Sequence, residues 1–517
     1  MNTERATLPL REALAQALPE RPFRLELWDG SRVPATNGAG GPTFRLRSPR
    51  ALGHVLRAPG QLGLGRAYVS GDIEVDDIDA VLELLDAYSV PSLDARSKAR
   101  LAAGAVRAGA LRSMPRAPAA ELRPQGRRHS RERDRRAVSH HYDVSNEFFG
   151  LVLGESMTYS CAIFSRGAQT LEAAQRAKLE LVCTKLDLRT GERVLDVGCG
   201  WGSFALHAAG EHGAHVTAIT LSEPQAALAR ERAAAARLAD RIEIRVADYR
   251  DLGGEQFDAI ASIGMVEHVG SANIDAYARQ LATVLRPGGR LLNHGIARLR
   301  HGDPEAGPFS ERFVFPDAAP LHLSRVLTAL ESAGLEPKHV EGFRHDYART
   351  LRAWARNLDE HAERAESLVG PERLRVWRLY LRAARRGFET GFTSIFQIVA
   401  HRPHGRPPNP PLRATAVNPV AAPASPPMPN RRAIDRTGPA LTARPDGRKE
   451  GEQPLASNHA YARIDHIGPL GRDDRNGRST ATVEFPTPKR TDCQAIRYST
   501  PIWRAPPSTI RRPAKMS

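Results

Sequence analysis

A strand, a glycine-rich turn and a helix follow one another in the segment Arg193-Val-Leu-Asp-Val-Gly-Cys-Gly-Trp-Gly-Ser-Phe204. The apolar run from Val194 to Val197 predicts a buried strand. Gly198, Gly200 and Gly202 then open a tight turn, where the absence of side chains lets a bound ligand approach the backbone closely. The helix that follows directs free N–H groups and its positive dipole end at an anionic part of that ligand. The segment therefore predicts a turn that binds a nucleotide-like cofactor.

The spacing of these glycines distinguishes two classes of cofactor. Nicotinamide enzymes use G-x-G-x-x-G and an acidic residue about 20 positions further on. Here the glycines are closer together, and the second predicted strand ends in Thr220. Both differences favour S-adenosylmethionine over a nicotinamide cofactor.

The charge of the chain is concentrated in two segments. The formal net charge is +16, yet residues 401–517 alone carry 20 Lys and Arg against 9 Asp and Glu, and residues 112–136 carry 9 Arg against 3 acidic residues. The rest is nearly neutral, whereas a nucleic-acid-binding protein usually presents a basic patch on its folded surface. We therefore expect no nucleic-acid partner. The two basic segments are either simply solvated or attracted to an anionic membrane surface.

The 517 residues divide into four predicted regions. Residues 1–95 predict a small N-terminal α/β domain, with strands near 23–28 and 43–46 and a helix over 78–88. Residues 96–136 predict a basic linker, or a helix followed by a linker. Residues 137–402 predict the catalytic domain. Residues 403–517 predict a disordered tail, because 20 of the 39 prolines follow residue 400 and few apolar positions recur there.

The catalytic domain alternates predicted strands and helices. The strands are expected at 193–198, 214–220, 241–246, 257–263, 290–297 and 394–400, and the helices at 203–212, 223–237, 271–285 and 321–333. Residues 286–290 (Arg-Pro-Gly-Gly-Arg) predict a turn ahead of a strand. This alternation predicts an α/β fold with a doubly wound, parallel, Rossmann-like sheet and helices on both faces.

Cysteine usage and hydropathy bear on the compartment. The four cysteines form no C-x-x-C pair and no zinc spacing, which predicts a reducing environment and no metal site. No apolar run reaches the roughly 18 residues that a bilayer span needs, and the N-terminus lacks the apolar core of a signal peptide. We expect a cytoplasmic protein.

Several further motifs accompany the glycine turn in a fixed order. They are His140–Phe149, Met157–Cys161, Thr220–Gln225, Ala247–Asp251, Met265–Gly270, Leu292–Ile296 and Asp346–Leu351. With them, residues 137–402 resemble the bacterial cyclopropane-fatty-acyl-phospholipid synthase family and the related mycolic acid cyclopropane synthases. Residues 20–90 look like the smaller N-terminal domain of its longer members.

This resemblance implies transfer of a methylene from S-adenosylmethionine to the cis double bond of an unsaturated phospholipid acyl chain. A base must remove a proton from the added methyl group, and in the family that base is thought to be bicarbonate. The matching catalytic positions are Glu267, His294, Tyr347, Cys161 and Ile296, the last two through backbone groups. Ala384 stands where many relatives have a cysteine, so a thiol mechanism at that position is excluded.

The cofactor positions carried over from the resemblance and the turn are Tyr159, Ser160, Asp196, Gly198, Gly200, Gly202, Thr220, Gln225, Asp248 and Tyr249. Thr220 and Gln225 are expected at the ribose or methionine part, and Asp248 or Tyr249 against the adenine. The expected partner is unsaturated phospholipid at the inner face of the membrane. A homodimer is compatible with the resemblance.

Each residue alone also fits a structural role. Glu267 fits a helix cap, Asp196 a cap of the turn, His294 a core histidine and Tyr347 ordinary core. Leu374, Trp377, Leu381 and Phe388 recur at helical spacing, and we expect this stripe to pack against the sheet rather than face a membrane. The alternative functions are synthesis of methyl-branched or methylene acyl chains, non-catalytic lipid binding, and nucleic-acid methylation.

Overall fold

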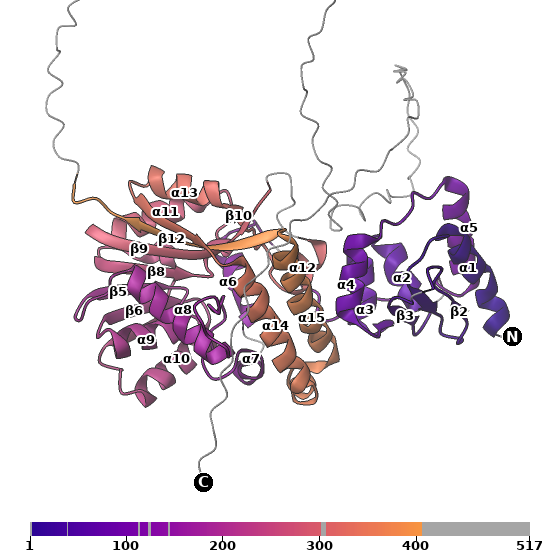
Figure 1. Ribbon diagram of the computed structural model, residues 1–517, viewed down its shortest axis with the longest axis horizontal. Helices are drawn as coiled ribbons and strands as arrows, with labels where there is room; N and C mark the ends of the chain where they lie inside the picture. Colours follow the sequence, from indigo (N-terminus) through magenta and orange to yellow (C-terminus); the bar gives the residue numbers. More distant parts are fainter. Residues whose placement is uncertain are drawn as a thin grey trace, which may run out of the picture. The chain divides into compact units, whose positions relative to one another are not determined.

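The computed structural model describes residues 3–405, apart from residues 39, 112–113, 123–125, 143–144 and 301–306. The tail predicted over 403–517 lies outside the described residues from 406 onward. Two sheets are present in the described part of the chain. Strands between residues 24 and 75 form a sheet of four, and strands between residues 193 and 401 form a sheet of eight (Figure 1).

The smaller sheet has the strand order β2-β1-β3-β4 and is accompanied by five helices. A Cβ atom at Gly104 would lie 2.9 Å from the Cα of Leu10, so glycine allows α1 and α5 to pack closely. The predicted strands near 23–28 and 43–46 and the helix over 78–88 are confirmed as β1, β3 and α4. The elements are α1 Thr3–Ala17, β1 Arg24–Glu26, β2 Arg32–Val33, β3 Thr43–Leu46, α2 Arg50–Arg57, α3 Gln61–Val69, β4 Ile73–Val75, α4 Ile78–Ala87 and α5 Ala95–Arg107.

The larger sheet has the strand order β11-β12-β9-β8-β5-β6-β7, with the short β10 pairing beside β9. Strands β5 to β9 are mutually parallel along this path, as predicted. The strand predicted at 394–400 is β12, but it runs antiparallel to β9, and its antiparallel neighbour β11 was not predicted. The strands are β5 Arg193–Val197, β6 His215–Thr220, β7 Ile242–Val246, β8 Phe257–Ile263, β9 Leu285–Arg298, β10 Leu321–His322, β11 Glu336–Gly342 and β12 Thr393–His401.

The turn predicted at 286–290 is part of β9. The register between β8 and β9 shifts between Phe257 and Ala259, so this stretch forms an irregular start of the strand. Gly288 has a positive φ of 78° and donates its N–H to the carbonyl of Arg402 at 2.7 Å. The proline and glycines therefore mark a distortion in a strand, where a turn before it was expected.

Helices cover both faces of the larger sheet. One apolar cluster joins α8, α9 and α10 to the sheet, and another joins α11 and α13 to it. The helices predicted at 203–212, 223–237, 271–285 and 321–333 are confirmed as α9, α10, α11 and α13, the last preceded by β10. The helical elements are α6 Arg131–Tyr142, α7 Asn146–Leu153, α8 Leu171–Lys185, α9 Ser203–Glu211, α10 Glu223–Ala235, η1 Tyr249–Asp251, η2 Val266–His268, α11 Ile274–Val284, α12 Pro308–Phe313, α13 Leu323–Ser332, α14 Arg344–Glu360 and α15 Ala362–Thr390.

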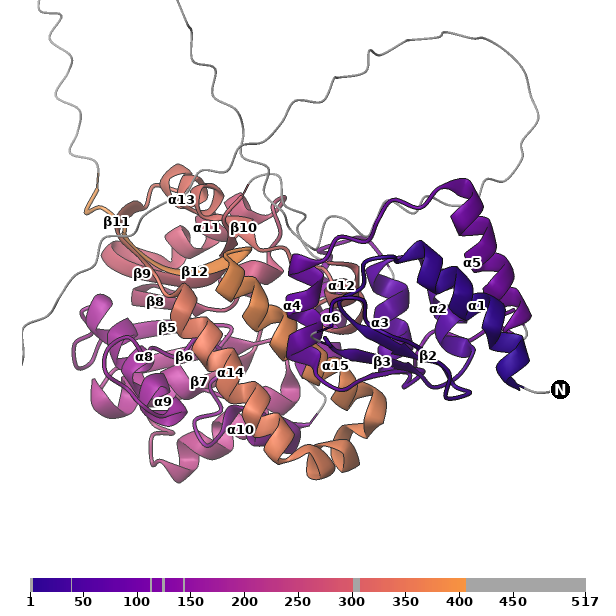
Figure 2. The ribbon, with the colours of Figure 1, turned by 45° about the vertical axis from the view of Figure 1, so that its right-hand side comes forward.

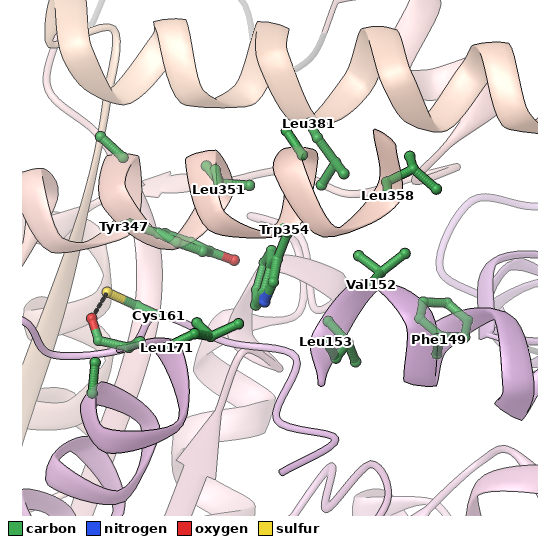
Figure 3. Packing of buried hydrophobic residues seen from close by; sticks show 14 of the residues in the cluster. Phe149, Val152, Leu153, Cys161, Leu171, Tyr347, Leu351, Trp354, Leu358 and Leu381 are labelled. Carbon is green, nitrogen blue, oxygen red and sulfur yellow. Dashed lines mark hydrogen bonds between the residues drawn. The ribbon is translucent and has the colours of Figure 1, made fainter. Parts of the chain in front are cut away.

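The last two helices, α14 and α15, lie side by side (Figure 2). The apolar stripe of α15 is buried, chiefly against α14 and α7 rather than directly on the sheet. Leu381 of α15 and Leu351, Trp354 and Leu358 of α14 belong to one apolar cluster (Figure 3). The stripe thus packs inside the domain. In the part of the chain that the structure describes, no helix combines the length and apolarity that a bilayer crossing requires.

Candidate active site

The glycine turn after β5 is shaped by left-handed backbone conformations. Gly198, Gly200 and Gly202 have φ values of 79°, 55° and 80°, which L-residues with side chains rarely adopt. The N–H groups of Gly198 and Cys199 both donate to the carbonyl of Ile219, at 3.0 and 2.9 Å, and so fix the turn to the end of β6. Helix α9 starts directly afterwards at Ser203. The local geometry is the one that the sequence pattern predicts.

The three glycines of the turn differ in what surrounds them. A Cβ atom at Gly200 would meet no atom within 4 Å, and Gly200 lines a cavity of about 160 Å³. A Cβ atom at Gly198 would lie 3.2 Å from the side chain of Met265 on the same cavity wall. Gly202 is not among the described lining residues, and a Cβ atom there would lie 3.2 Å from Cβ of Ala229 in α10. Gly202 therefore allows α10 to pack closely against the turn.

The cavity gathers the predicted cofactor residues from the ends of β5, β6 and β7 and from the segment between α7 and α8. Nine of the ten line it, namely Tyr159, Ser160, Asp196, Gly198, Gly200, Thr220, Gln225, Asp248 and Tyr249. Because β5, β6, β7 and β8 are parallel, their carboxyl ends meet at one edge, where ligands of such sheets bind. The remaining walls include aromatic and apolar side chains such as Trp201, Phe204 and Ile219.

Hydrogen bonds hold the polar groups after β6 and β7 in place. Thr220 Oγ1 donates to Oε1 of Gln225 at 2.8 Å. Asp248 accepts bonds from the guanidinium of Arg250 at 2.5 and 2.8 Å. Although burial opposes ionisation of Asp248, these bonds lower its pKa. Burial also raises the pKa of Tyr249 to about 12, so its phenol stays protonated at neutral pH. Asp248 thus stays ionised, as a carboxylate paired with Arg250, at the expected adenosine end.

Asp196 and Lys178 form the buried polar floor of the cavity. Burial raises the pKa of Asp196 to about 7, against the opposing effect of the Lys178 charge. Burial likewise lowers the pKa of Lys178 to about 8. The Lys178 ammonium donates to Ser160 Oγ at 3.1 Å, whereas Oδ2 of Asp196 has no hydrogen-bond partner among the described residues. A cation and an open acceptor side by side fit the carboxylate and amino groups of S-adenosylmethionine.

Sequence reasoning missed Lys178 as a cavity residue. It lies on α8 in a position whose neighbours at helical spacing, Ala174 and Leu181, are buried. A lysine in an apolar helical stripe is the signal that would have found it, because such a charge is rarely buried without a polar partner. Asp134 of α6 and His268 of η2 also line the cavity. Asp134 lies outside the predicted motifs, whereas His268 lies within the motif Met265–Gly270 but was not singled out as a site residue.

The five predicted catalytic residues lie beside this cavity, outside its described lining. Ser160 and Met265, which line it, neighbour Cys161 and Glu267 in sequence and so connect the two sites. Gly264, also a lining residue, donates its N–H to the carbonyl of His294 at 2.8 Å. The structure therefore places the predicted base site directly behind one cavity wall.

Glu267 is buried in η2, the short helix that follows β8. Its Oε1 accepts the N–H of Ile296 at 2.7 Å, while Oε2 has no hydrogen-bond partner among the described residues. Burial raises the pKa of Glu267 to about 7, only partly offset by the bond from Ile296. The backbone N–H of Ile296, one of the backbone groups expected at the base site, is thus bonded to Glu267. Glu267 therefore presents one open oxygen that exchanges protons near neutral pH.

Two consecutive hydrogen bonds determine which ring nitrogen of His294 carries the proton. Lys185 donates to Oε1 of Gln397 at 2.7 Å, so the amide nitrogen of Gln397 faces His294 and donates to Nδ1 at 2.9 Å. With Nδ1 accepting, the neutral imidazole carries its proton on Nε2. Burial, reinforced by the charges of Lys178 and Lys185, lowers the pKa of His294 well below its usual range. Nε2 has no partner among the described residues and is thus an open N–H donor. Sequence reasoning had missed Gln397 and Lys185.

Phe343 links His294 to Cys161 and Tyr347, the remaining two predicted catalytic residues. Its ring is stacked on His294 with 6.4 Å between centroids, and its carbonyl lies 3.8 Å from the sulfur of Cys161. Tyr347 lies one turn further along α14, with its ring edge-on to Trp354 (Figure 3). Burial raises the pKa of the Cys161 thiol, which makes it a poor nucleophile and agrees with a backbone role. All five residues belong to one neighbourhood.

This neighbourhood fits a small oxyanion such as bicarbonate. The open Nε2–H of His294 is a hydrogen-bond donor, and the open oxygen of Glu267 donates when protonated. Both are buried and lack partners among the described residues, which would be costly if no ligand supplied them. The residues therefore suit the ion that the resemblance implies.

Comparison with known proteins places this site in a family. The family model for mycolic acid cyclopropane synthetase matches residues 129–398. The chain is 40% identical to a probable fatty acid methyltransferase of Mycobacterium tuberculosis over 77% of its own length and 96% of that protein. It is 32% identical to the cyclopropane-fatty-acyl-phospholipid synthase of Escherichia coli K12, over 71% of this chain and 90% of that one.

A solved structure with a similar fold contains a nucleoside ligand. It is the mycolic acid cyclopropane synthase CmaA1 complexed with SAH and CTAB, with 30% identity and a TM-score of 0.50, covering 52% of this chain and 98% of that one. The cavity at the carboxyl ends of β5 to β8 has the position and polar groups that such a cofactor needs. The chain therefore belongs to the mycolic acid cyclopropane synthetase family and is an S-adenosylmethionine-dependent methyltransferase.

Proposed function

We propose that this enzyme converts the cis double bond of an unsaturated phospholipid acyl chain into a cyclopropane ring. One observation carries the proposal: the open oxygen of Glu267 and the open N–H of His294 lie buried behind the wall of the cofactor cavity. Methyl transfer to a nitrogen or oxygen nucleophile releases a proton from a heteroatom, which water can accept. Transfer to an alkene leaves a carbocation, and a base must then take a proton from it.

The walls around Tyr159 suit a cationic intermediate. Tyr159 is stacked on His141 at 5.7 Å and contacts Trp354 at 5.2 Å, and Phe149 packs on Trp201 at 4.8 Å. Aromatic faces stabilise a nearby cation, and their bulk excludes the water that would trap it. Because an alkene is a weak nucleophile, much of the rate must come from holding it in line with the sulfonium. The rigid aromatic wall provides that positioning.

The polar residues behind the wall would then hold the base. Glu267 is fixed by Ile296, and His294 by Gln397 and Lys185, so each open atom has a defined direction. Bicarbonate, when bound, supplies the oxygen that accepts the proton. His294 stays neutral and donates from Nε2, while Glu267, with its pKa near 7, shares a proton with the ion. One proton leaves the new methyl group as the ring closes.

A second product is favoured by the relatives. The protein that is 40% identical to this chain is named a probable fatty acid methyltransferase, and a further one at 32% is named a tuberculostearic acid methyltransferase. The same methyl transfer gives a branched alkene when the proton leaves a neighbouring chain carbon. The two products have identical mass, so they must be separated by structure.

Proton magnetic resonance distinguishes them. The enzyme is incubated with S-adenosylmethionine and a phospholipid that carries one cis double bond, and the extracted lipid is compared with that from Glu267→Gln. Ring closure should consume the olefinic protons and produce methylene signals far upfield of the other acyl protons. A methylated product without upfield signals would establish the branched product instead. A lipid left unmodified by wild-type enzyme, while S-adenosylmethionine still binds, would refute acyl-chain chemistry altogether.

A further inference from the structure

A second group of chemically reactive side chains lies between α8 and α9, away from the cofactor cavity. It consists of Cys183, His207 and His212, whose sulfur and nitrogen atoms all lie within 4.8 Å of one another. None of the three is among the described residues that line the cavity. The group plays no part in the proposed reaction, and nothing in that reaction explains it.

The helices bring these residues together from separate places in the chain. Glu180 and Cys183 are three positions apart on α8 and therefore share a face. His207 projects from α9, and His212 follows directly where that helix ends. The imidazole rings lie 5.9 Å apart, and Nε2 of each is bonded to the same oxygen of Glu180, at 3.1 Å for His207 and 3.0 Å for His212.

An ion pair alone accounts for only part of this arrangement. A single carboxylate oxygen that receives two imidazoles explains the orientation of His207 and His212, but it does not explain why a thiol points to the same place. Cys183 is fully buried, while the side chains of His207 and His212 are 15% and 20% exposed. Glu180 is half exposed, so the group lies next to solvent on one side. A buried sulfur, two mostly buried imidazoles and a half-exposed carboxylate match the ligands of a largely closed metal site.

We propose that Cys183, His207, His212 and Glu180 bind a zinc ion that joins α8 to α9. One thiolate, two imidazoles and a carboxylate form a ligand set that zinc accepts in tetrahedral geometry. Tetrahedral bonds of about 2.0–2.3 Å place neighbouring ligand atoms about 3.3–3.6 Å apart, so Cys183, His207 and His212 need to close by roughly 1 Å. Glu180, which contacts the two imidazoles, has to turn its carboxylate toward the ion as well. On binding, the Cys183 thiol releases its proton, and each imidazole offers Nε2 with the proton on Nδ1.

Such an ion would lie outside the cofactor cavity and would affect the reaction only through the packing of the helices. Because α9 begins at the glycine turn, a metal bound between α8 and α9 would restrict the motion of the helix whose N-terminus faces the cofactor site. No metal was expected, because the four cysteines form neither a C-x-x-C pair nor a zinc spacing, and Cys183 stands 24 positions before His207. The folded packing of two helices supplies the proximity that spacing does not.

The test uses the full-length chain, stripped of metal with a chelator and titrated with Co²⁺ as a spectroscopic probe. Wild-type protein should develop the strong visible bands of tetrahedral cobalt and a near-ultraviolet thiolate-to-cobalt band, and Zn²⁺ should displace both. Zn²⁺ should also raise the melting temperature, because it binds the folded state only. Cys183→Ser should lose the thiolate band, and Glu180→Gln should weaken binding about 10–100-fold.

His207→Gln and His212→Gln extend the test to partly exposed positions, where substitution is tolerated should Cys183→Ser fail to fold. Each should weaken cobalt binding by more than about tenfold. His215→Gln is the matched control, because His215 is an exposed histidine three positions beyond His212 and should bind as wild type does. Pale octahedral cobalt, a thiolate band that persists in Cys183→Ser, or equal weakening by His215→Gln would overturn the proposal.

Discussion

The backbone N–H of Ile296 donates to the carboxylate of Glu267 across 2.7 Å, and this bond joins strand β9 to the short helix η2. It occupies one oxygen of Glu267 and leaves the other open in a buried site. A glutamate held in this way does not act as a helix cap, the structural role that it could have had. Its position is fixed while its second oxygen remains available to a ligand.

The substitution Glu267→Gln should therefore separate cofactor binding from turnover. Glutamine can still accept the N–H of Ile296, so the local fold should be kept, but it cannot share a proton. We expect turnover to fall by about 100-fold or more, the usual scale for a lost acid–base group. Calorimetry should show unchanged affinity for S-adenosylmethionine. A variant with wild-type turnover would remove Glu267 from the mechanism.

The stability of the cofactor-free protein should depend on Glu267 through pH. Burial raises the pKa of this carboxyl from 4.5 to about 7, so the folded state keeps a proton that the unfolded chain loses. Below about pH 4.5 the carboxyl keeps its proton in both the folded and the unfolded state. As the pH rises from there through about 7, the unfolded chain loses this proton first, so the free energy of unfolding falls. Urea unfolding at pH 5 and pH 8 should show the stability of wild type relative to Glu267→Gln decreasing at the higher pH. A difference independent of pH would mean that the carboxyl is not desolvated.

The glycine turn should tolerate no side chain at Gly200. Its φ of 55° disfavours any β-branched residue, and the space beside it belongs to the cavity. We expect Gly200→Val to abolish detectable binding of S-adenosylmethionine in calorimetry. Gly254→Val is the matched control, because Gly254 has a φ of 76° and open space around it but does not line the cavity. Equal loss of binding in both variants would point to backbone strain instead of occlusion.

The proton position on His294 should be controlled by Gln397. A glutamate at that position accepts hydrogen bonds only, so Gln397→Glu should move the imidazole proton from Nε2 to Nδ1. Nitrogen chemical shifts of labelled histidine should report this change, and turnover should fall while affinity for S-adenosylmethionine stays the same. Gln169→Glu, at an exposed glutamine, is the control for the added charge. An unchanged tautomer together with wild-type turnover would show that Gln397 does not position His294.

The sequence was most informative where chemistry follows strand ends. Thr220, Asp248 and the glycines each stand at or just after the end of a predicted parallel strand. Parallel strands end at one edge of a sheet, so their convergence was predictable. Lys178 and Gln397 were missed because each is a single polar residue in an apolar stripe, where periodicity predicts only burial. The direction of β12 was also missed, since alternating hydrophobicity predicts a strand but not whether it runs parallel. Contacts such as Gln397 with His294 depend on that antiparallel pairing.

Residues 406–517 should be dispensable for folding and chemistry. Within the described residues, β12 is the last strand of the larger sheet in chain order, and it ends at His401. The side chain of Arg402 then donates to the carbonyl of Ala282 at 2.8 Å. A chain that ends at Gly405 keeps these contacts and removes most of the basic, proline-rich composition. We expect its melting temperature, and its turnover on detergent-dispersed lipid, to match the full-length protein. Binding to anionic vesicles at low salt should weaken, since cations near an anionic surface contribute about 1 kcal/mol each before screening. Unfolding of the shortened chain would show that the tail contributes to the fold, and unchanged vesicle binding would exclude its electrostatic role.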